Sequence, residues 1–121
     1  MKKMLLTAAV ALGAFGGSAA FAASGAVIST DQIVKLCSAK NDASAKNFCN
    51  GYAQGVYDMY VASRHPKHNP AFLCFPNPGP SRQKAIDDYL AWAAKNPQFG
   101  TSTAADSMMR YLAGAYPCKK K

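Results

Sequence analysis

The residue type best able to do chemistry in this 121-residue chain is cysteine, present as Cys37, Cys49, Cys74 and Cys118. All four lie after a short apolar leader. In an exported protein an even number of cysteines indicates disulfides, whereas the same number in the cytosol would favour a zinc site. No C-x-x-C pair or other spacing typical of zinc or haem attachment occurs. We therefore predict two disulfides and no metal or other cofactor.

Histidine and aspartate provide no alternative site. His65 and His68 are three residues apart, but Pro66 lies between them, so no helix is expected to hold both imidazoles on one face. The six acidic residues are all aspartates, and the adjacent Asp87 and Asp88 would point about 100° apart on a helix. No nucleophile elbow, H-E-x-x-H motif or phosphate-binding loop occurs. These observations predict a protein that is not an enzyme.

The leader has the three parts of a secretory signal peptide. Lys2 and Lys3 precede an apolar run over residues 5–15, and the small residues of 20–22 form a cleavage site. The alternative, a retained membrane anchor, would need roughly 20 apolar residues. We expect cleavage after Ala22, a folded domain over residues 23–118, a basic tail over 119–121, and no membrane span after cleavage.

The net charge does not indicate a nucleic-acid partner. The formal charge is +8, but Lys2, Lys3 and the tail at 119–121 supply five of the lysines. A nucleic-acid interface needs lysine and arginine concentrated on one element, and the remaining ones are scattered. We therefore predict no nucleic-acid binding.

Caps and apolar periodicity predict four helices. Ser29 and Gln32 form a capping box that opens a helix ending near residues 41–42. A longer helix follows over about 44–63. Ser81 caps a third helix that stops at 96–97, and Thr103 caps a fourth that Pro117 terminates. Five prolines between 66 and 80 indicate a loop, and no period-two pattern indicates a sheet. The expected fold is all-α, a compact bundle of about four helices in two hairpins.

The second helix has two features of interest. Phe48, Tyr52 and Met59 share an apolar stripe at helical spacing, and Cys49, Val56 and Tyr60 lie beside it. Gly51 and Gly55 lie one turn apart, and each costs up to about 1 kcal/mol relative to alanine. We expect a neighbouring backbone or ring to approach these glycines closely; the alternative is that they are merely tolerated.

The helical order favours one of the three pairings that four cysteines allow. A short turn joins the first two helices, which should therefore be antiparallel neighbours with Cys37 facing Cys49. By the same reasoning Cys74, before the third helix, should meet Cys118, after the fourth. Each disulfide would then close one hairpin.

An ordered set of motifs resembles the Rap/Tai group of periplasmic immunity proteins. Its founding members neutralise peptidoglycan amidases delivered by type VI secretion. The resemblance spans Cys37 to Cys118 and rests on these segments: Cys49-Asn50-Gly51-Tyr52-Ala53-Gln54-Gly55-Val56-Tyr57-Asp58, Cys74-Phe75-Pro76, Arg82-Gln83, Tyr89-Leu90, Pro97 and Tyr116-Pro117-Cys118. Besides the cysteines, it assigns structural roles to Gly51, Tyr52, Gly55, Asp58, Pro76, Tyr89 and Pro117.

The resemblance implies a non-catalytic protein of the Gram-negative periplasm that binds and occludes a secreted amidase. The alternative is a general stress or chaperone-like protein, or an envelope accessory protein, with the same fold. A homodimer through a helix face is also compatible with the sequence.

Two loops are candidate partner-binding surfaces. The first, over residues 64–73, presents cations, imidazoles and an aromatic ring at Arg64, His65, Lys67, His68 and Phe72. Its prolines limit the ordering cost of binding, and such mixed patches anchor interfaces. The second, over 96–101, presents Phe99. The alternative for each loop is that its apolar residues fold back onto the domain.

Overall fold

A computed structural model describes residues 26–64 and 70–119 of the chain. It contains four α-helices and one short 3₁₀ helix: α1 (Thr30–Cys37), α2 (Ala43–Ser63), α3 (Arg82–Lys95), η1 (Pro97–Phe99) and α4 (Ala104–Ala115). Apart from two isolated β-bridges, no strand occurs in these two ranges. The predicted all-α fold is confirmed. None of the helices described here has both the length and the hydropathy needed to cross a bilayer.

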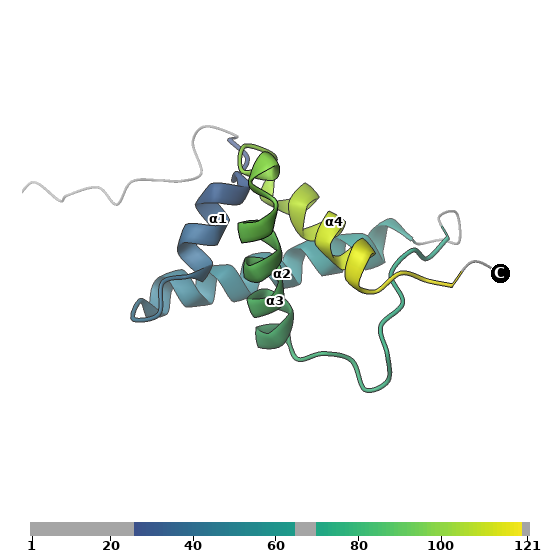
Figure 1. Cartoon of the computed structure of the whole chain (residues 1–121). Helices are drawn as coiled ribbons and strands as arrows, with labels where there is room; N and C mark the ends of the chain where they lie inside the picture. The colour runs from purple at the N-terminus through teal and green to yellow at the C-terminus, as the bar shows by residue number, and fades with distance from the viewer. Residues whose placement is uncertain (1–25, 65–69, 120–121) are drawn as a thin grey trace, which may run out of the picture.

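The longest helix, α2, runs across the molecule behind α3 in the view of Figure 1. The helices α1, α3 and α4 pack against α2 and against one another. Residues 70–81, which lead into α3, run past the end of α4 and then away from the helices before α3 begins (Figure 1). One compact helical body results, with a long connection along one side.

Local side-chain chemistry sets the helix starts. The Ser29–Gln32 capping box is present at α1, and the hydroxyls of Ser81 and Thr103 cap α3 and α4 as predicted. The first helix is shorter than expected, because it ends at Cys37 and the extended Asp42 caps α2 instead. The 3₁₀ turn η1 was not predicted.

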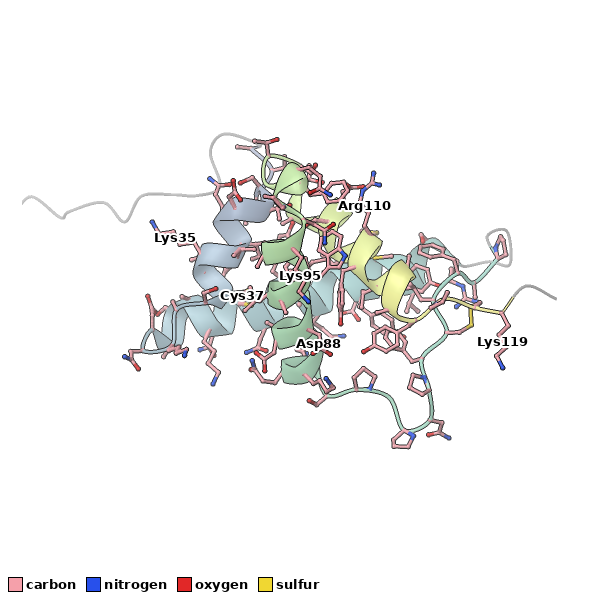
Figure 2. The ribbon with its side chains drawn as sticks, viewed as in Figure 1. Lys35, Cys37, Asp88, Lys95, Arg110 and Lys119 are labelled. Atoms are coloured by element: carbon pink, nitrogen blue, oxygen red, sulfur yellow. A yellow bond between two sulfur atoms is a disulfide. The ribbon has the colours of Figure 1, made fainter. Side chains whose placement is uncertain are left out.

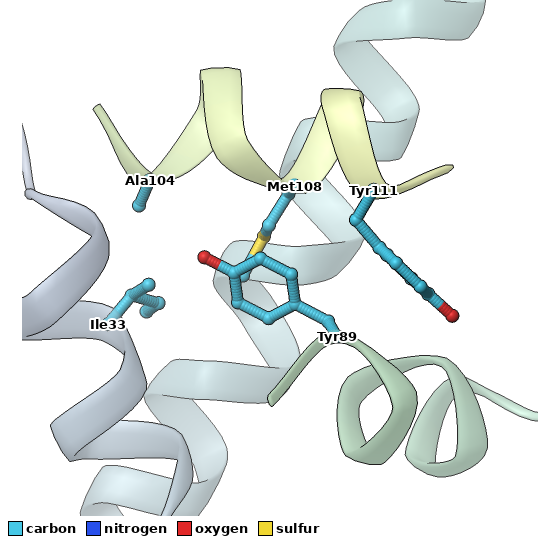
Figure 3. Close-up of a cluster of buried hydrophobic side chains, with 5 residues drawn as sticks. All are labelled: Ile33, Tyr89, Ala104, Met108 and Tyr111. Carbon is cyan, nitrogen blue, oxygen red and sulfur yellow. The ribbon is translucent and has the colours of Figure 1, made fainter. Parts of the chain in front are cut away.

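The main core lies where α1, α3 and α4 meet one another and pack against α2. Its buried members are Ile33, Tyr89, Ala104, Met108 and Tyr111 (Figure 3). Half-buried side chains of α2, among them Tyr52 and Val56, pack against this cluster. Each helix therefore contributes its apolar face to one shared cluster.

Three hydroxyl groups form a hydrogen-bonded network inside this core. Ser107 is fully buried, and its Oγ lies 2.7 Å from the Tyr89 hydroxyl and 2.8 Å from Thr30 Oγ1. Ser107 also donates to the Ala104 carbonyl, and Thr30 donates to the Ser102 carbonyl. Because buried polar groups are costly unless they are hydrogen-bonded, this network fixes how α1, α3 and α4 sit together.

The side of α2 that faces the core differs from the predicted stripe. Phe48 is 45% exposed and Met59 is 69% exposed, whereas Cys49 and Tyr60 are buried. The two pairs lie roughly 100° apart around the helix. The disulfide at Cys49 and the hydroxyl bonds of Tyr60 turn their side of α2 inward.

The prediction of close packing at the two α2 glycines is wrong. A Cβ built on Gly51 or Gly55 meets no atom within 4 Å. Both glycines lie on the exposed side of α2, so nothing within the described domain requires a glycine at either position.

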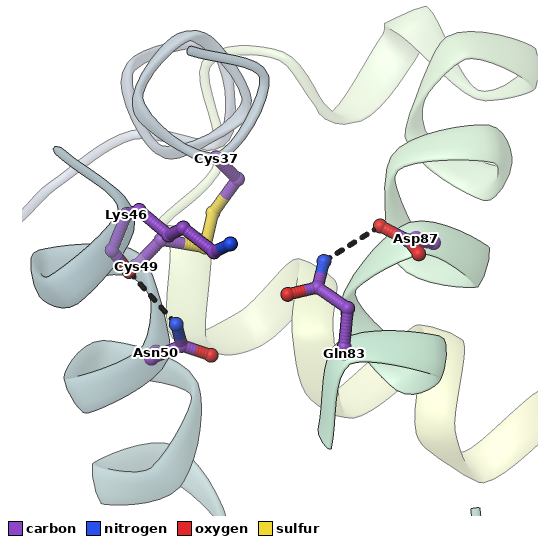
Figure 4. Close-up of a disulfide and its surroundings, with 6 residues drawn as sticks. All are labelled: Cys37, Lys46, Cys49, Asn50, Gln83 and Asp87. Carbon is purple, nitrogen blue, oxygen red and sulfur yellow. Dashed lines mark hydrogen bonds between the residues drawn. A yellow bond between two sulfur atoms is a disulfide. The ribbon is translucent and has the colours of Figure 1, made fainter. Parts of the chain in front are cut away.

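Both predicted disulfides are present. Cys37–Cys49 joins the end of α1 to α2, with Cα atoms 5.2 Å apart (Figure 4). It lies beside a small hollow that is lined by Lys46, Asn50 and Asp87, among others. Cys74–Cys118 joins the connection before α3 to the segment after α4, with Cα atoms 4.8 Å apart. No cysteine is free.

Candidate functional site

Five aromatic rings form a cluster beside the second disulfide, which we call the distal aromatic cluster. In order of contact its members are Phe72, Tyr60, Tyr57, Phe75 and Tyr116. The centroid separations of successive rings are 4.8, 6.2, 5.6 and 4.7 Å. The cluster therefore connects α2, the segment before α3 and the segment after α4.

Hydrogen bonds and the disulfide fix this cluster. The Tyr60 hydroxyl accepts from the backbone amides of Phe72 and Leu73, at 3.2 and 3.1 Å. The Cys74 amide donates to the Tyr116 carbonyl, and the Cys118 amide donates to the Phe72 carbonyl. The two chain segments are thus tied to each other and to α2, although neither belongs to a helix.

Part of the cluster faces solvent. Phe72 is 48% exposed and Tyr57 is 36% exposed, and Val61 on the next turn of α2 is 39% exposed. The Arg64 guanidinium lies 5.7 Å from the centre of the Tyr60 ring. We call Tyr57, Val61, Arg64 and Phe72 the distal surface. Tyr57 and Phe72 both contact the Tyr60 ring, Val61 lies one turn from Tyr57 on α2, and the half-buried Arg64 lies over the Tyr60 ring.

The distal surface includes two of the predicted partner-binding residues, Arg64 and Phe72. The other three on that loop, His65, Lys67 and His68, lie outside the described residues. Tyr57 and Val61 were missed, although their four-residue spacing on α2, with Arg64 three residues further on, is the signal that places them on one face.

Phe99, predicted in the second loop, packs back onto the domain. Its ring stacks on Trp92 with centroids 5.5 Å apart and planes 11° apart, and the Arg110 guanidinium lies 5.2 Å from its centre. Phe99 is half-buried. This is the folded-back alternative stated for that loop.

An apolar groove of about 500 Å³ adjoins the distal aromatic cluster. We call it the α2–α3 groove. Its lining comes from α2, from residues 75–80, and from α3 and α4: Ala53, Gln54, Val56, Tyr57, Phe75, Pro76, Gly79, Pro80, Arg82, Ala85, Ile86, Tyr89, Met108, Tyr111 and Leu112. Sequence reasoning did not identify it.

The residues assigned structural roles occupy different parts of the fold. Tyr89 lies in the core and Pro76 lines the α2–α3 groove. Pro117 forms an isolated bridge with Leu73 next to the second disulfide. Tyr52 is half-buried and contacts the Phe48 ring, and the exposed Asp58 accepts a hydrogen bond from Gln54.

The electrostatics of the described residues give no reaction centre. Burial raises the pKa of Tyr52, Tyr89 and Tyr111, which keeps these phenols neutral. The charged side chains labelled in Figure 2 are spread over several elements. Lys84 and Arg110 each pair with an aspartate one turn away on the same helix. Residues 26–64 and 70–119 contain no group of three potential metal ligands.

The described residues form an exposed aromatic patch held by a disulfide, with an apolar groove beside it. The chain matches the family model of the Rap1a immunity proteins over residues 29–118, a span that includes both disulfides and all the helices described above. Neither a curated protein nor a solved structure matches it. The chain therefore belongs to the Rap1a immunity protein family, in agreement with the resemblance seen in its sequence.

Proposed function

We propose that this protein is a periplasmic immunity protein that binds a peptidoglycan amidase effector and blocks its active site without doing chemistry of its own. The observation that carries the proposal is the family match over the whole helical domain. The leader and the two disulfides support export to an oxidising compartment.

We propose the distal surface as the place where the effector binds. Aromatic and arginine side chains dominate the energetics of many interfaces, and this surface offers Tyr57, Phe72 and Arg64. The disulfide and the Tyr60 hydroxyl bonds hold the surface in place before binding. Little conformational entropy is then lost on association, which favours a stable complex.

The test uses any peptidoglycan amidase that is encoded next to the gene for this chain. The purified proteins are titrated by calorimetry, and hydrolysis of peptidoglycan is followed with and without the immunity protein. We expect a complex with a nanomolar Kd and loss of hydrolysis at equimolar ratio. A pair that shows neither result would reject the proposal. Light scattering on the free chain distinguishes the monomer from the homodimer.

A matched pair of substitutions tests the surface. Phe72 and Phe48 are 48% and 45% exposed, but only Phe72 lies on the distal surface. Phe72→Ser should weaken amidase binding by about 10- to 100-fold, as expected for an anchor residue. Phe48→Ser should change it less than threefold. Equal effects of the two substitutions would place the contact elsewhere.

A further inference from the structure

The α2–α3 groove is an apolar hollow that reaches the core of the domain. Tyr89, Met108 and Tyr111, drawn in Figure 3, belong to both the core and the groove lining. Protein interiors are close-packed and rarely contain voids larger than a water molecule. The groove volume of about 500 Å³ lies in the range of known ligand sites. An apolar side chain entering it would gain contacts that the free protein lacks.

Among the described residues that line the groove, Arg82 alone is charged. Arg82, the first residue of α3, donates from Nε and Nη2 to Gln54 Oε1, at 3.1 and 2.6 Å. Lys84 and Arg110 pair with carboxylates on their own helices, whereas the hydrogen-bond acceptor of Arg82 is a neutral amide. Among the described residues, no carboxylate lies within ion-pair distance of Arg82.

The environment of Arg82 suits an incoming anion. The nearest link to a carboxylate runs through Gln54, whose Nε2 donates to Asp58 at 2.7 Å, so the Gln54 amide stands between the two charges. An arginine–carboxylate pair is typically bidentate and stronger than a bond to a neutral amide. A ligand carboxylate could therefore replace Gln54 as the acceptor for Arg82.

The groove is continuous with the distal surface. Tyr57 belongs to both, and the Phe75 ring that lines the groove lies 5.6 Å from the Tyr57 ring. A protein bound at the distal surface would therefore have a segment close to the mouth of the groove. This continuity favours a peptide segment over a free small molecule as the occupant.

We propose that the α2–α3 groove binds a peptide segment of the partner in which an apolar side chain is followed by a carboxylate. The apolar side chain enters the groove above Tyr89 and Met108, and the carboxylate pairs with Arg82. The inference rests on the proposed function in taking the partner to be a protein that binds at the distal surface.

Peptide titration of the mature protein tests the inference directly. The probe is the end-blocked hexapeptide Ser-Gly-Phe-Asp-Gly-Ser, and the readout is amide chemical shift in NMR spectra. We expect saturable shifts at Gln54, Arg82 and Ile86, and at least fivefold weaker binding when asparagine replaces the peptide's aspartate. Arg82→Gln should weaken binding of the aspartate peptide about tenfold. Lys84→Gln, an exposed position outside the groove lining, is the control and should not.

Three outcomes of these titrations would overturn the inference, and a fourth comes from the amidase. The first is equal binding of the aspartate and asparagine peptides, and the second is an Arg82→Gln variant that binds as well as the original protein. The third is tighter binding of dodecanoate than of the peptide, which would make the site one for a free apolar acid. Calorimetry with the amidase is run separately, so that amidase binding unaffected by Arg82→Gln refutes the groove alone.

Discussion

Removing the Ser107 hydroxyl tests whether the buried hydrogen-bond network of Thr30, Tyr89 and Ser107 holds α1, α3 and α4 together. Ser107 is fully buried and Tyr89 is 2% exposed, with their hydroxyl oxygens 2.7 Å apart. Ser107→Ala deprives the Tyr89 hydroxyl of its closest partner and puts no water in its place. An unsatisfied buried hydroxyl costs about 1–3 kcal/mol. That is a substantial part of the roughly 5–15 kcal/mol that stabilises a small domain.

A double-mutant cycle isolates this contribution. Tyr89→Phe removes the same hydrogen bond from the other side but leaves Ser107 bonded to Thr30 and to the Ala104 carbonyl. It should therefore cost only about 0.5–1.5 kcal/mol. In the double variant no phenol remains to be orphaned, so its cost should fall below the sum of the single costs by about 1 kcal/mol.

The assay is urea unfolding of the oxidised protein, followed by circular dichroism with the slope m compared among variants. Ser44→Ala, an exposed serine on α2, is the control and should change stability by less than about 0.5 kcal/mol. Costs of Ser107→Ala and Tyr89→Phe that add within about 0.3 kcal/mol would refute the network as a coupled unit.

Three further predictions concern stability. Replacing Cys37 and Cys49 together by alanine should lower the free energy of unfolding in urea by about 3 kcal/mol. Removing Cys74–Cys118, which closes the larger loop, should lower it by about 4 kcal/mol. A larger loss from the first pair than from the second would contradict the loop-entropy reasoning. Gly55→Ala should raise the free energy of unfolding by about 0.5–1 kcal/mol because its Cβ meets nothing, and a lower Tm would show an unrecognised contact. The pKa of Tyr111 is raised by burial above the ordinary value of 10.0, so above pH 10 the unfolded chain loses protons that the folded chain keeps. The free energy of unfolding should therefore fall as pH rises above 10, and less steeply in Tyr111→Phe.

Most features that the sequence predicted correctly depend on neighbouring residues; the exception is Cys74–Cys118, whose cysteines are 44 residues apart and flank the hairpin of α3 and α4. The caps at Ser29, Ser81 and Thr103 need only a side-chain oxygen and an amide three residues away. The pairing of Cys37 with Cys49 follows from a short turn between two helices. In each case the interaction closes within a single element or a single hairpin, so chain order is sufficient information.

The orientation of α2 could not be obtained in this way. Several sides of that helix carry aromatic or aliphatic residues. Local periodicity therefore does not distinguish the side with Phe48 and Met59 from the side with Cys49 and Tyr60. Which stripe is buried depends on the disulfide and on Tyr60 bonding to Phe72, twelve residues away. The bond from Phe72 lies outside the sequence of α2, whereas the predicted pairing of Cys37 with Cys49 already indicated that the Cys49 side faces inward.

The candidate site was predictable in part for the same reason. Arg64 and Phe72 stood out because they flank one proline-rich loop. The α2–α3 groove is built from residues such as Gln54, Phe75 and Arg82, which belong to three separate segments. No spacing along the chain brings these together, because their proximity depends on how residues 75–80 return to α3.

The two disulfides therefore make different contributions to the protein. Cys37–Cys49 joins two helices that already bury apolar side chains against each other, so its effect is mainly on stability. Cys74–Cys118 fixes two non-helical segments, whose other attachments to the domain include the Tyr60 hydroxyl and the ring contacts of Phe75. Those same segments supply Phe72 to the distal surface and Phe75 to the groove wall. The second disulfide thus acts on the proposed binding surface itself, since it pre-orders the segments that would otherwise have to be ordered when a partner binds.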